Sequence, residues 1–118
     1  MEKLKVAFYW AASCGGCEIA VLDINEKILD VVAKVDIVFW PVAIDVKYKD
    51  VEAMPDKSID ACFFNGAIRT EENEHMAKLL RQKSKILVAF GSCACDGCVK
   101  GLANLWSKKT IFERAYFE

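Results

Sequence analysis

The chain has 118 residues, enough for one ordinary domain that buries roughly two-thirds of the surface of its unfolded form. Its 16 Lys and Arg residues nearly balance 17 Asp and Glu residues, and a net charge of -1 excludes a charge-based argument for nucleic-acid or anionic-membrane binding. Apolar residues make up 54% of the chain but form short runs, none near the ~20 residues of a membrane span. With no hydrophobic signal segment after the first residues, we expect a cytoplasmic protein.

The first half of the chain predicts two strands separated by one long helix. Residues 5–12 form a nearly continuous apolar run, which is typical of a strand covered on both faces of a parallel sheet. Residues 18–34 carry apolar side chains at three- and four-residue steps, the pattern of an amphipathic helix packed on the sheet. Residues 36–43 predict a second strand that ends near Pro41, and residues 45–60 predict a surface loop with a short helix.

The second half predicts two more strands and a capped helix. Residues 60–68 form a third apolar strand, after which Thr70 offers a hydroxyl to begin a helix. Acidic residues follow Thr70 and basic residues gather toward residue 85, as the helix dipole favours. Residues 85–90 form a fourth strand. This alternation predicts an α/β fold, a flavodoxin-like open and mostly parallel sheet with helices on both faces, as one domain over residues 1–118.

Five of the six cysteines lie in two glycine-containing turns that follow the first and fourth predicted strands. Because thiols stay reduced in the cytoplasm, these cysteines indicate metal binding or redox chemistry rather than disulfides. The carboxyl ends of parallel strands share one edge, so the two turns should meet there. The turns are Cys14-Gly15-Gly16-Cys17 and Cys93-Ala94-Cys95-Asp96-Gly97-Cys98.

These turns predict an iron-sulfur cluster held by Cys14, Cys17 and Cys93. A two-residue gap lets one turn place two thiolates on neighbouring irons, and glycines let backbone N–H groups approach the cluster sulfurs. Cys98 is the candidate retained for a fourth ligand. Since side chains alternate in direction along an extended turn, we do not expect Cys93, Cys95 and Cys98 all to reach one cluster.

Two other residues have simpler interpretations, and two alternative functions stay open. Cys62 lies inside an apolar strand and is expected in the core, and Glu18 suits the first turn of its helix electrostatically. One alternative is a thioredoxin-like thiol-disulfide oxidoreductase that uses Cys14 and Cys17, although such a protein needs a cis-proline facing the cysteines. The other is a zinc-stabilised binding module that uses Cys14, Cys17 and two later cysteines.

Several segments, in this order, resemble the small subunit of nickel-iron hydrogenases, especially the cytoplasmic methyl-viologen-reducing type associated with heterodisulfide reductase. The same domain type occurs in the quinone-reducing respiratory complex. The segments are Cys14-Gly15-Gly16-Cys17, Leu22-Asp23, Pro41-Val42, Asp45-Val46-Lys47, Asn65-Gly66-Ala67-Ile68-Arg69-Thr70-Glu71-Glu72-Asn73-Glu74, Ser84-Lys85-Ile86, Ala89-Phe90-Gly91-Ser92-Cys93-Ala94 and Gly101-Leu102-Ala103-Asn104-Leu105.

The resemblance implies an electron-relay subunit that is not catalytic alone. Its proximal [4Fe-4S] cluster, with Cys14, Cys17 and Cys93 as the first three ligands, would take electrons from a nickel-iron large subunit. The electrons would leave through ferredoxin-like or heterodisulfide-reductase electron-transfer subunits. In this family the fourth ligand comes from a Gly-Cys-Pro segment beyond the position of Glu118, and a later domain carries further clusters. This sequence contains neither, and it has Cys95 and Cys98 where the family has other residues.

Overall fold

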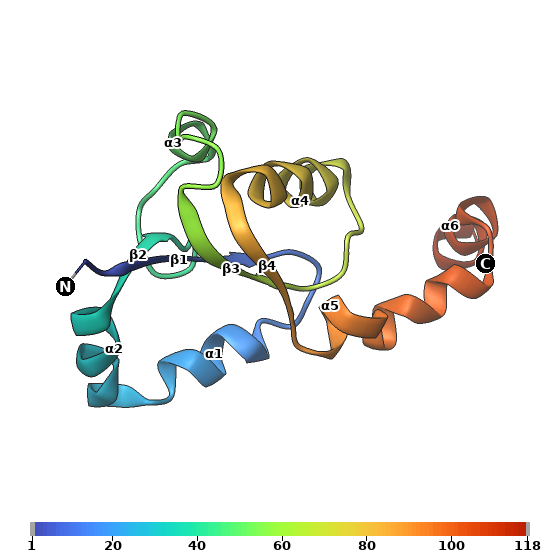
Figure 1. Cartoon of the computed structure of the whole chain (residues 1–118). Helices are drawn as coiled ribbons and strands as arrows, with labels where there is room; N and C mark the ends of the chain where they lie inside the picture. Colours follow the sequence, from blue (N-terminus) through green and yellow to red (C-terminus); the bar gives the residue numbers. More distant parts are fainter. Residues whose placement is uncertain (1, 118) are drawn as a thin grey trace.

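The computed structural model describes residues 2–117, in which four parallel strands form the central sheet (Figure 1). All neighbouring strands are parallel, in the order β2-β1-β3-β4. The carboxyl ends of the strands therefore lie along one edge, which confirms the predicted α/β, flavodoxin-like class. The strands are β1 (Leu4–Trp10), β2 (Val35–Phe39), β3 (Ile59–Asn65) and β4 (Ser84–Phe90).

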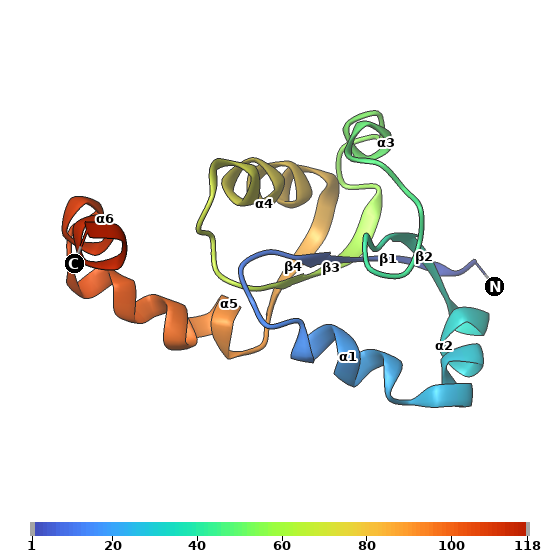
Figure 2. The same cartoon turned by 180° about the vertical axis from the view of Figure 1, so that it is seen from behind.

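Helices cover both faces of the sheet (Figures 1 and 2). On one face lie α3 (Tyr48–Glu52) and α4 (Glu71–Lys83), above a core that includes the side chains Tyr9, Phe39, Cys62, Phe64, Met76 and Leu80. On the other face lie α1 (Gly16–Leu22) and α2 (Ile28–Lys34), above a smaller core formed around Val6, Phe8 and Trp40. Burial of these side chains from both directions explains why the strands read as continuous apolar runs.

The predicted single helix over residues 18–34 is wrong. The structure divides it into α1, a short 3₁₀ segment η1 (Asn25–Lys27) and α2. Asn25 has a φ of 54°, in the left-handed region, so it does not continue an α-helix. The break lets α1 and α2 run in different directions (Figure 2) and leaves Leu29 and Val31 exposed, so the regular apolar spacing did not correspond to one packed face.

The predicted helix after Thr70 is confirmed as α4. The Thr70 Oγ1 accepts a hydrogen bond from the Asn73 backbone N–H at 3.1 Å. In return the Asn73 side chain accepts from the Thr70 backbone N–H at 3.2 Å, which completes a capping box. Acidic side chains in the first turn and Arg81 and Lys83 in the last agree with the predicted dipole pattern.

The segment after β4 is helical rather than the extended turn expected from the sequence. It contains α5 (Ser92–Asp96), a 3₁₀ segment η2 (Cys98–Leu105) and α6 (Lys108–Phe117). Figure 1 shows η2 and α6 projecting away from the sheet, which gives the molecule its longest dimension of 58 Å. Along this projection large apolar side chains face solvent, namely Val99, Leu102, Leu105, Trp106, Phe112 and Tyr116. We call residues 98–117, which contain η2 and α6, the arm.

Among residues 2–117, no helix combines the length and the apolar character needed to cross a bilayer.

Candidate metal centre

The two cysteine turns begin from strands on either side of β3. Trp10 pairs with Asn65, and Asn65 pairs with Phe90, so the last residues of β1, β3 and β4 form one row across the sheet. The chain leaves this row at the same edge after β1 and after β4. The parallel register thus places the two turns beside each other, as the strand order requires.

The first turn contains Cys14 and Cys17 and depends on glycine at position 15. Gly15 has a φ of 81°, and a Cβ there would lie 2.5 Å from the Trp10 ring. Its N–H donates to Ser13 Oγ at 3.0 Å, and the Trp10 Nε1 donates to the Ser13 carbonyl at 3.0 Å. The Gly16 N–H donates to Cys14 Sγ at 3.4 Å. The first turn is therefore held tightly against Trp10 and offers a backbone donor to one cysteine sulfur.

The second turn reaches the first through Gly91. Gly91 has a φ of 89°, and a Cβ on it would lie only 2.4 Å from Cys17 Sγ. A side chain at position 91 would thus occupy the place of the Cys17 sulfur. Because Gly91 is two residues before Cys93, thiols that are 76 positions apart in the sequence, Cys17 and Cys93, belong to adjoining turns. This contact between the turns is the main geometric feature of the site.

Cys98 lies beside Cys93 rather than apart from it. Hydrogen bonds from the Ser92 side chain and the Val99 backbone N–H lower the pKa of the Cys98 thiol, and a hydrogen bond with Cys93 adds to this effect. Cys98 has a φ of 48° and its N–H donates to Asp96 Oδ1 at 3.1 Å, which holds it in this unusual conformation. Lys100 Nζ lies 3.5 Å from Cys93 Sγ and supplies a positive charge to the same corner.

The two remaining cysteines do not face this corner. The Cys95 thiol donates to the Ala89 carbonyl at 3.4 Å and so points back toward β4. Cys62 is fully buried, and burial raises the pKa of its thiol to about 12. The prediction of Cys62 as a core residue is confirmed, and the helical path of α5 explains why Cys95 diverges from Cys93 and Cys98.

The residue that follows Cys17 in the sequence, Glu18, has a buried carboxyl group. Glu18 lies in the first turn of α1, as expected from the sequence, and it is only 1% exposed. Burial raises the pKa of the Glu18 carboxyl. Two neighbours oppose this rise: the Trp40 indole N–H, which donates to Glu18 Oε2, and the Asn65 amide. Asn65 is also 1% exposed, yet neither atom of its amide has a hydrogen-bond partner of normal geometry in the described structure.

Sequence reasoning missed Asn65 and Gly91 as residues of this site. A signal for Asn65 was present, because a polar side chain closes an otherwise apolar strand directly before a glycine. The signal for Gly91 was its place between a strand and the Ser-Cys pair. Neither signal says which side chain the residue meets, since that depends on how β1, β3 and β4 align.

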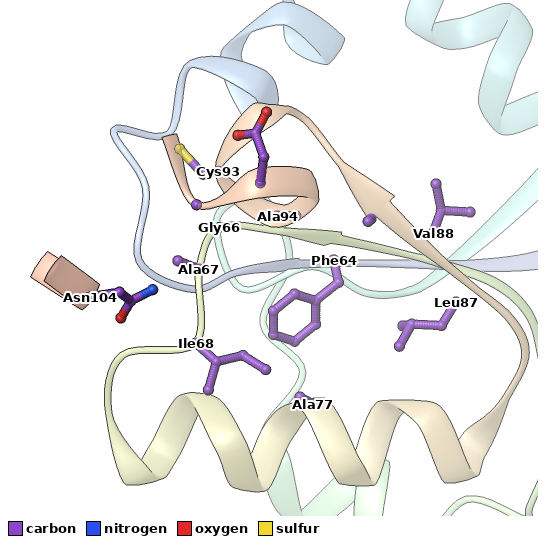
Figure 3. A pocket seen from close by; sticks show the side chains of 13 residues that line it. Phe64, Gly66, Ala67, Ile68, Ala77, Leu87, Val88, Cys93, Ala94 and Asn104 are labelled. Carbon is purple, nitrogen blue, oxygen red and sulfur yellow. The ribbon is translucent and has the colours of Figure 1, made fainter. Parts of the chain in front are cut away.

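A cavity of about 460 Å³ opens beside Cys93 (Figure 3). Figure 3 shows Phe64 from β3 and Ala77 from α4 facing each other across it, with Cys93 near its rim. A second cavity adjoins it through Ala67, Ile68, Gly97 and Asn104 and contains three cationic side chains, Arg69, Lys100 and Lys108. The surface around Cys93 is therefore hollowed, partly apolar and basic.

Cysteines on two adjoining turns are compatible with an iron-sulfur cluster. A zinc ion needs its ligands within about 2.0–2.3 Å of one point. The described residues contain no group of three or more His, Cys, Asp or Glu side chains placed to hold a metal ion. A cluster instead takes each thiolate on a different iron, so adjoining turns of cysteines suit it. The described residues also contain no cis peptide bond.

Comparison with known proteins gives one family and several relatives. Residues 14–116 match the family described as NADH ubiquinone oxidoreductase, 20 Kd subunit. Over 98% of its length the chain is 50% identical to an iron-sulfur subunit of the F420-non-reducing hydrogenase of Archaeoglobus profundus. It is 37% identical, also over 98% of its length, to a subunit of the F420-non-reducing hydrogenase of Methanothermobacter thermautotrophicus. The chain spans 36% of the length of each of these relatives.

A solved structure shares the fold. A chain of the NAD+-reducing [NiFe]-hydrogenase in the H2-reduced state superimposes with a TM-score of 0.82 and 24% sequence identity. The alignment covers 97% of this chain and 60% of that one. At this identity the match supports the arrangement of strands and helices rather than a shared activity.

Proposed function

The chain belongs to the family described as NADH ubiquinone oxidoreductase, 20 Kd subunit, and from this premise we propose that it is the electron-transfer small subunit of a nickel-iron hydrogenase-type complex. In this proposal residues 1–118 form a domain that holds a proximal [4Fe-4S] cluster. The cluster supplies a centre that accepts and releases single electrons. The contact between Gly91 and the Cys17 sulfur carries the proposal, because it brings the two cysteine turns into one place.

Cys14, Cys17 and Cys93 are the proposed iron ligands, and Cys98 is the proposed fourth. Cys14 and Cys17 supply two thiolates from the first turn, and the second turn supplies the others. The lowered pKa of the Cys98 thiol favours the thiolate form that binds iron. Its hydrogen bond with Cys93 supports this choice, whereas the Cys95 thiol faces β4.

The surroundings of these thiols support the proposed role. Lys100, beside Cys93, offsets the negative charge that several thiolates bring together. The Gly16 N–H already donates to Cys14 Sγ, a type of contact that tunes the potential of a cluster. The glycines at positions 15 and 91 leave room that any side chain would fill. In this proposal these residues thus bind the cluster, offset its negative charge and leave room for it. The chain itself performs no bond-making chemistry.

The proposed partners are a nickel-iron large subunit, which delivers electrons, and ferredoxin-like or heterodisulfide-reductase subunits, which receive them. The arm exposes six large apolar side chains, and Leu105 and Trp106 are 70% and 58% exposed. Exposed apolar surface of this kind is typical of protein–protein contacts. We assign the arm to subunit assembly, and we retain the cytoplasm as the compartment, since all six cysteines are free thiols.

Anaerobic reconstitution of the purified chain with iron and sulfide tests the proposal. We expect about four irons and four acid-labile sulfides per chain and an electron paramagnetic resonance signal after reduction. Cys14→Ala, Cys17→Ala and Cys93→Ala should each lose most of the iron, whereas Cys95→Ala should keep it. Zinc without sulfide would support the binding module instead, and disulfide reduction without any metal would support the thiol-disulfide oxidoreductase.

The fourth ligand has its own test. Cys98→Ala should lower cluster occupancy or convert the cluster to a three-iron form, and Cys98→Ser should partly restore it because oxygen also binds iron. Iron content unchanged in Cys98→Ala would remove Cys98 from the ligand set and leave the other three proposed ligands in place.

A further inference from the structure

Asn65 occupies the position between the two cysteine turns. It is the last residue of β3, and its register partners Trp10 and Phe90 end the strands from which the turns begin. Its side chain is 1% exposed, and neither amide atom makes a hydrogen bond of normal geometry among the described residues, although the amide lies close enough to the Glu18 carboxyl to oppose the rise in that group's pKa. A buried amide without a partner is costly, so such a group calls for a specific explanation.

The unpartnered amide lies next to the proposed ligands. Asn65 Oδ1 is 3.9 Å from the place that a Cβ would take on Gly91, and that same place is 2.4 Å from Cys17 Sγ. Both neighbours are fixed, because Gly91 follows the strand directly and Cys17 belongs to α1. The amide oxygen is the atom nearest this place, and a half-turn of the amide exchanges it with the NH2 group, which brings two N–H donors to within a few ångströms of a proposed thiolate ligand.

We propose that the Asn65 amide donates a hydrogen bond to sulfur at the cluster site, either Cys17 Sγ or an adjoining sulfide, and so stabilises the reduced cluster. This inference rests on the proposed function. Reduction adds negative charge to a centre that is already anionic, and an N–H donor aimed at sulfur stabilises that charge. Asn65 is then a positioning and tuning residue rather than a ligand.

A purely structural role for Asn65 has a different consequence. Glu18 Oε1 is also buried without a partner, and a rotation of the Asn65 side chain would allow these two groups to pair. In that arrangement Asn65 would attach α1 to the sheet, and its loss would lower stability without changing a reduction potential. The potential therefore distinguishes the two roles.

The experiment compares the reduction midpoint of the reconstituted chain with that of Asn65→Leu, which keeps similar volume and removes the amide. We expect Asn65→Leu to keep its iron and sulfide and to shift the midpoint to a more negative potential. Ser84→Ala is the matched control, because Ser84 is equally buried and unpartnered but begins β4 at the opposite edge of the sheet. Its midpoint should equal that of the wild type.

An unchanged midpoint in a fully loaded Asn65→Leu overturns this inference and leaves the proposed function intact. Wild-type protein that takes up no cluster overturns the proposed function, and the inference falls with it. The two failures are thus separate observations.

Pulsed electron paramagnetic resonance on protein labelled with ¹⁵N-asparagine decides the matter if Asn65→Leu does not load. Coupling between the reduced cluster and a labelled nitrogen should appear in the wild type and persist in Asn104→Leu, which alters the other asparagine near Cys93. No coupling in the wild type, or coupling lost in Asn104→Leu, overturns the inference.

Discussion

Gly91 controls how closely the two cysteine turns approach each other. Its φ of 89° and ψ of 168° lie in a region that essentially only glycine adopts. Gly91→Ala should lower the free energy of unfolding of the metal-free chain by about 1–3 kcal/mol from backbone strain. It should also displace the Cys17 sulfur, so that iron content after reconstitution falls to a small fraction of the wild-type value.

Urea unfolding and iron analysis check this prediction. Gly101→Ala is the control, because its φ is not in the left-handed region and the nearest contact of a Cβ there is an ordinary 3.4 Å. Gly91→Ala protein that loads iron as fully as Gly101→Ala would show that the turns need not approach so closely.

Asp60 joins β1, β3 and β4 at the amino-terminal edge of the sheet, opposite the cysteine turns. It accepts from the Lys5 backbone N–H at 2.8 Å and from Lys85 Nζ at 2.9 Å, which joins the second residues of β1 and β4. These contacts hold its pKa below the ordinary 3.8, the Lys5 hydrogen bond most of all. Because the pKa is lower in the folded state, the stabilisation is present above pH 3.8 and is lost as pH falls through the folded-state pKa.

Asp60→Asn should therefore be less stable than the wild type at pH 7, and the two proteins should converge in stability below pH 3.8. Thermal unfolding measured between pH 3 and pH 7 checks the prediction. The control is Asp36→Asn, because the Asp36 side chain on β2 is exposed. A stability difference that stays constant over this pH range would count against the assigned contacts.

At the level of elements, a cap predicts a helix better than apolar spacing does. The Thr70 and Asn73 side chains accept hydrogen bonds from backbone N–H groups that no backbone carbonyl of the helix can reach, so α4 begins where the sequence indicates. The predicted helix over residues 18–34 had the right spacing but no such start or stop signals inside it. Asn25, whose φ is positive, interrupts it.

Thr70→Ala should lower the free energy of unfolding by about 1 kcal/mol, because the first turn of α4 loses its side-chain acceptor. Thr70→Ser keeps the hydroxyl and should recover most of that stability. Urea denaturation of both variants measures the difference, and equal stability of Thr70→Ala and the wild type would contradict the capping role.

At the scale of the whole molecule, we propose separate roles for the sheet and the arm. The sheet edge gathers the proposed ligands, and the arm presents apolar side chains away from the sheet (Figure 1). Since the proposed role is electron relay, the purified and reconstituted chain should not reduce viologen dyes with hydrogen. It should still exchange electrons with a chemical reductant and oxidant. Hydrogen-dependent dye reduction by the single chain would refute the assignment of catalysis to a partner subunit.

The sequence by itself determined the parallel α/β sheet, the helix after Thr70 and the core position of Cys62, and it proposed Cys14, Cys17 and Cys93 as ligands, which stays a prediction. These features depend on local patterns, namely apolar runs, a cap and cysteine spacing, together with the rule that parallel strands share a carboxyl edge.

Only the tertiary structure decided how the site is assembled. The burial of Glu18, the unpartnered amide of Asn65 and the fit of Gly91 against the Cys17 sulfur depend on the register of β1, β3 and β4. The direction of Cys95 and Cys98 depends on the helical turn of α5 and the left-handed φ values of Gly97 and Cys98. The physical reason is that contacts between distant segments follow from the alignment of whole strands, which no short stretch of sequence specifies.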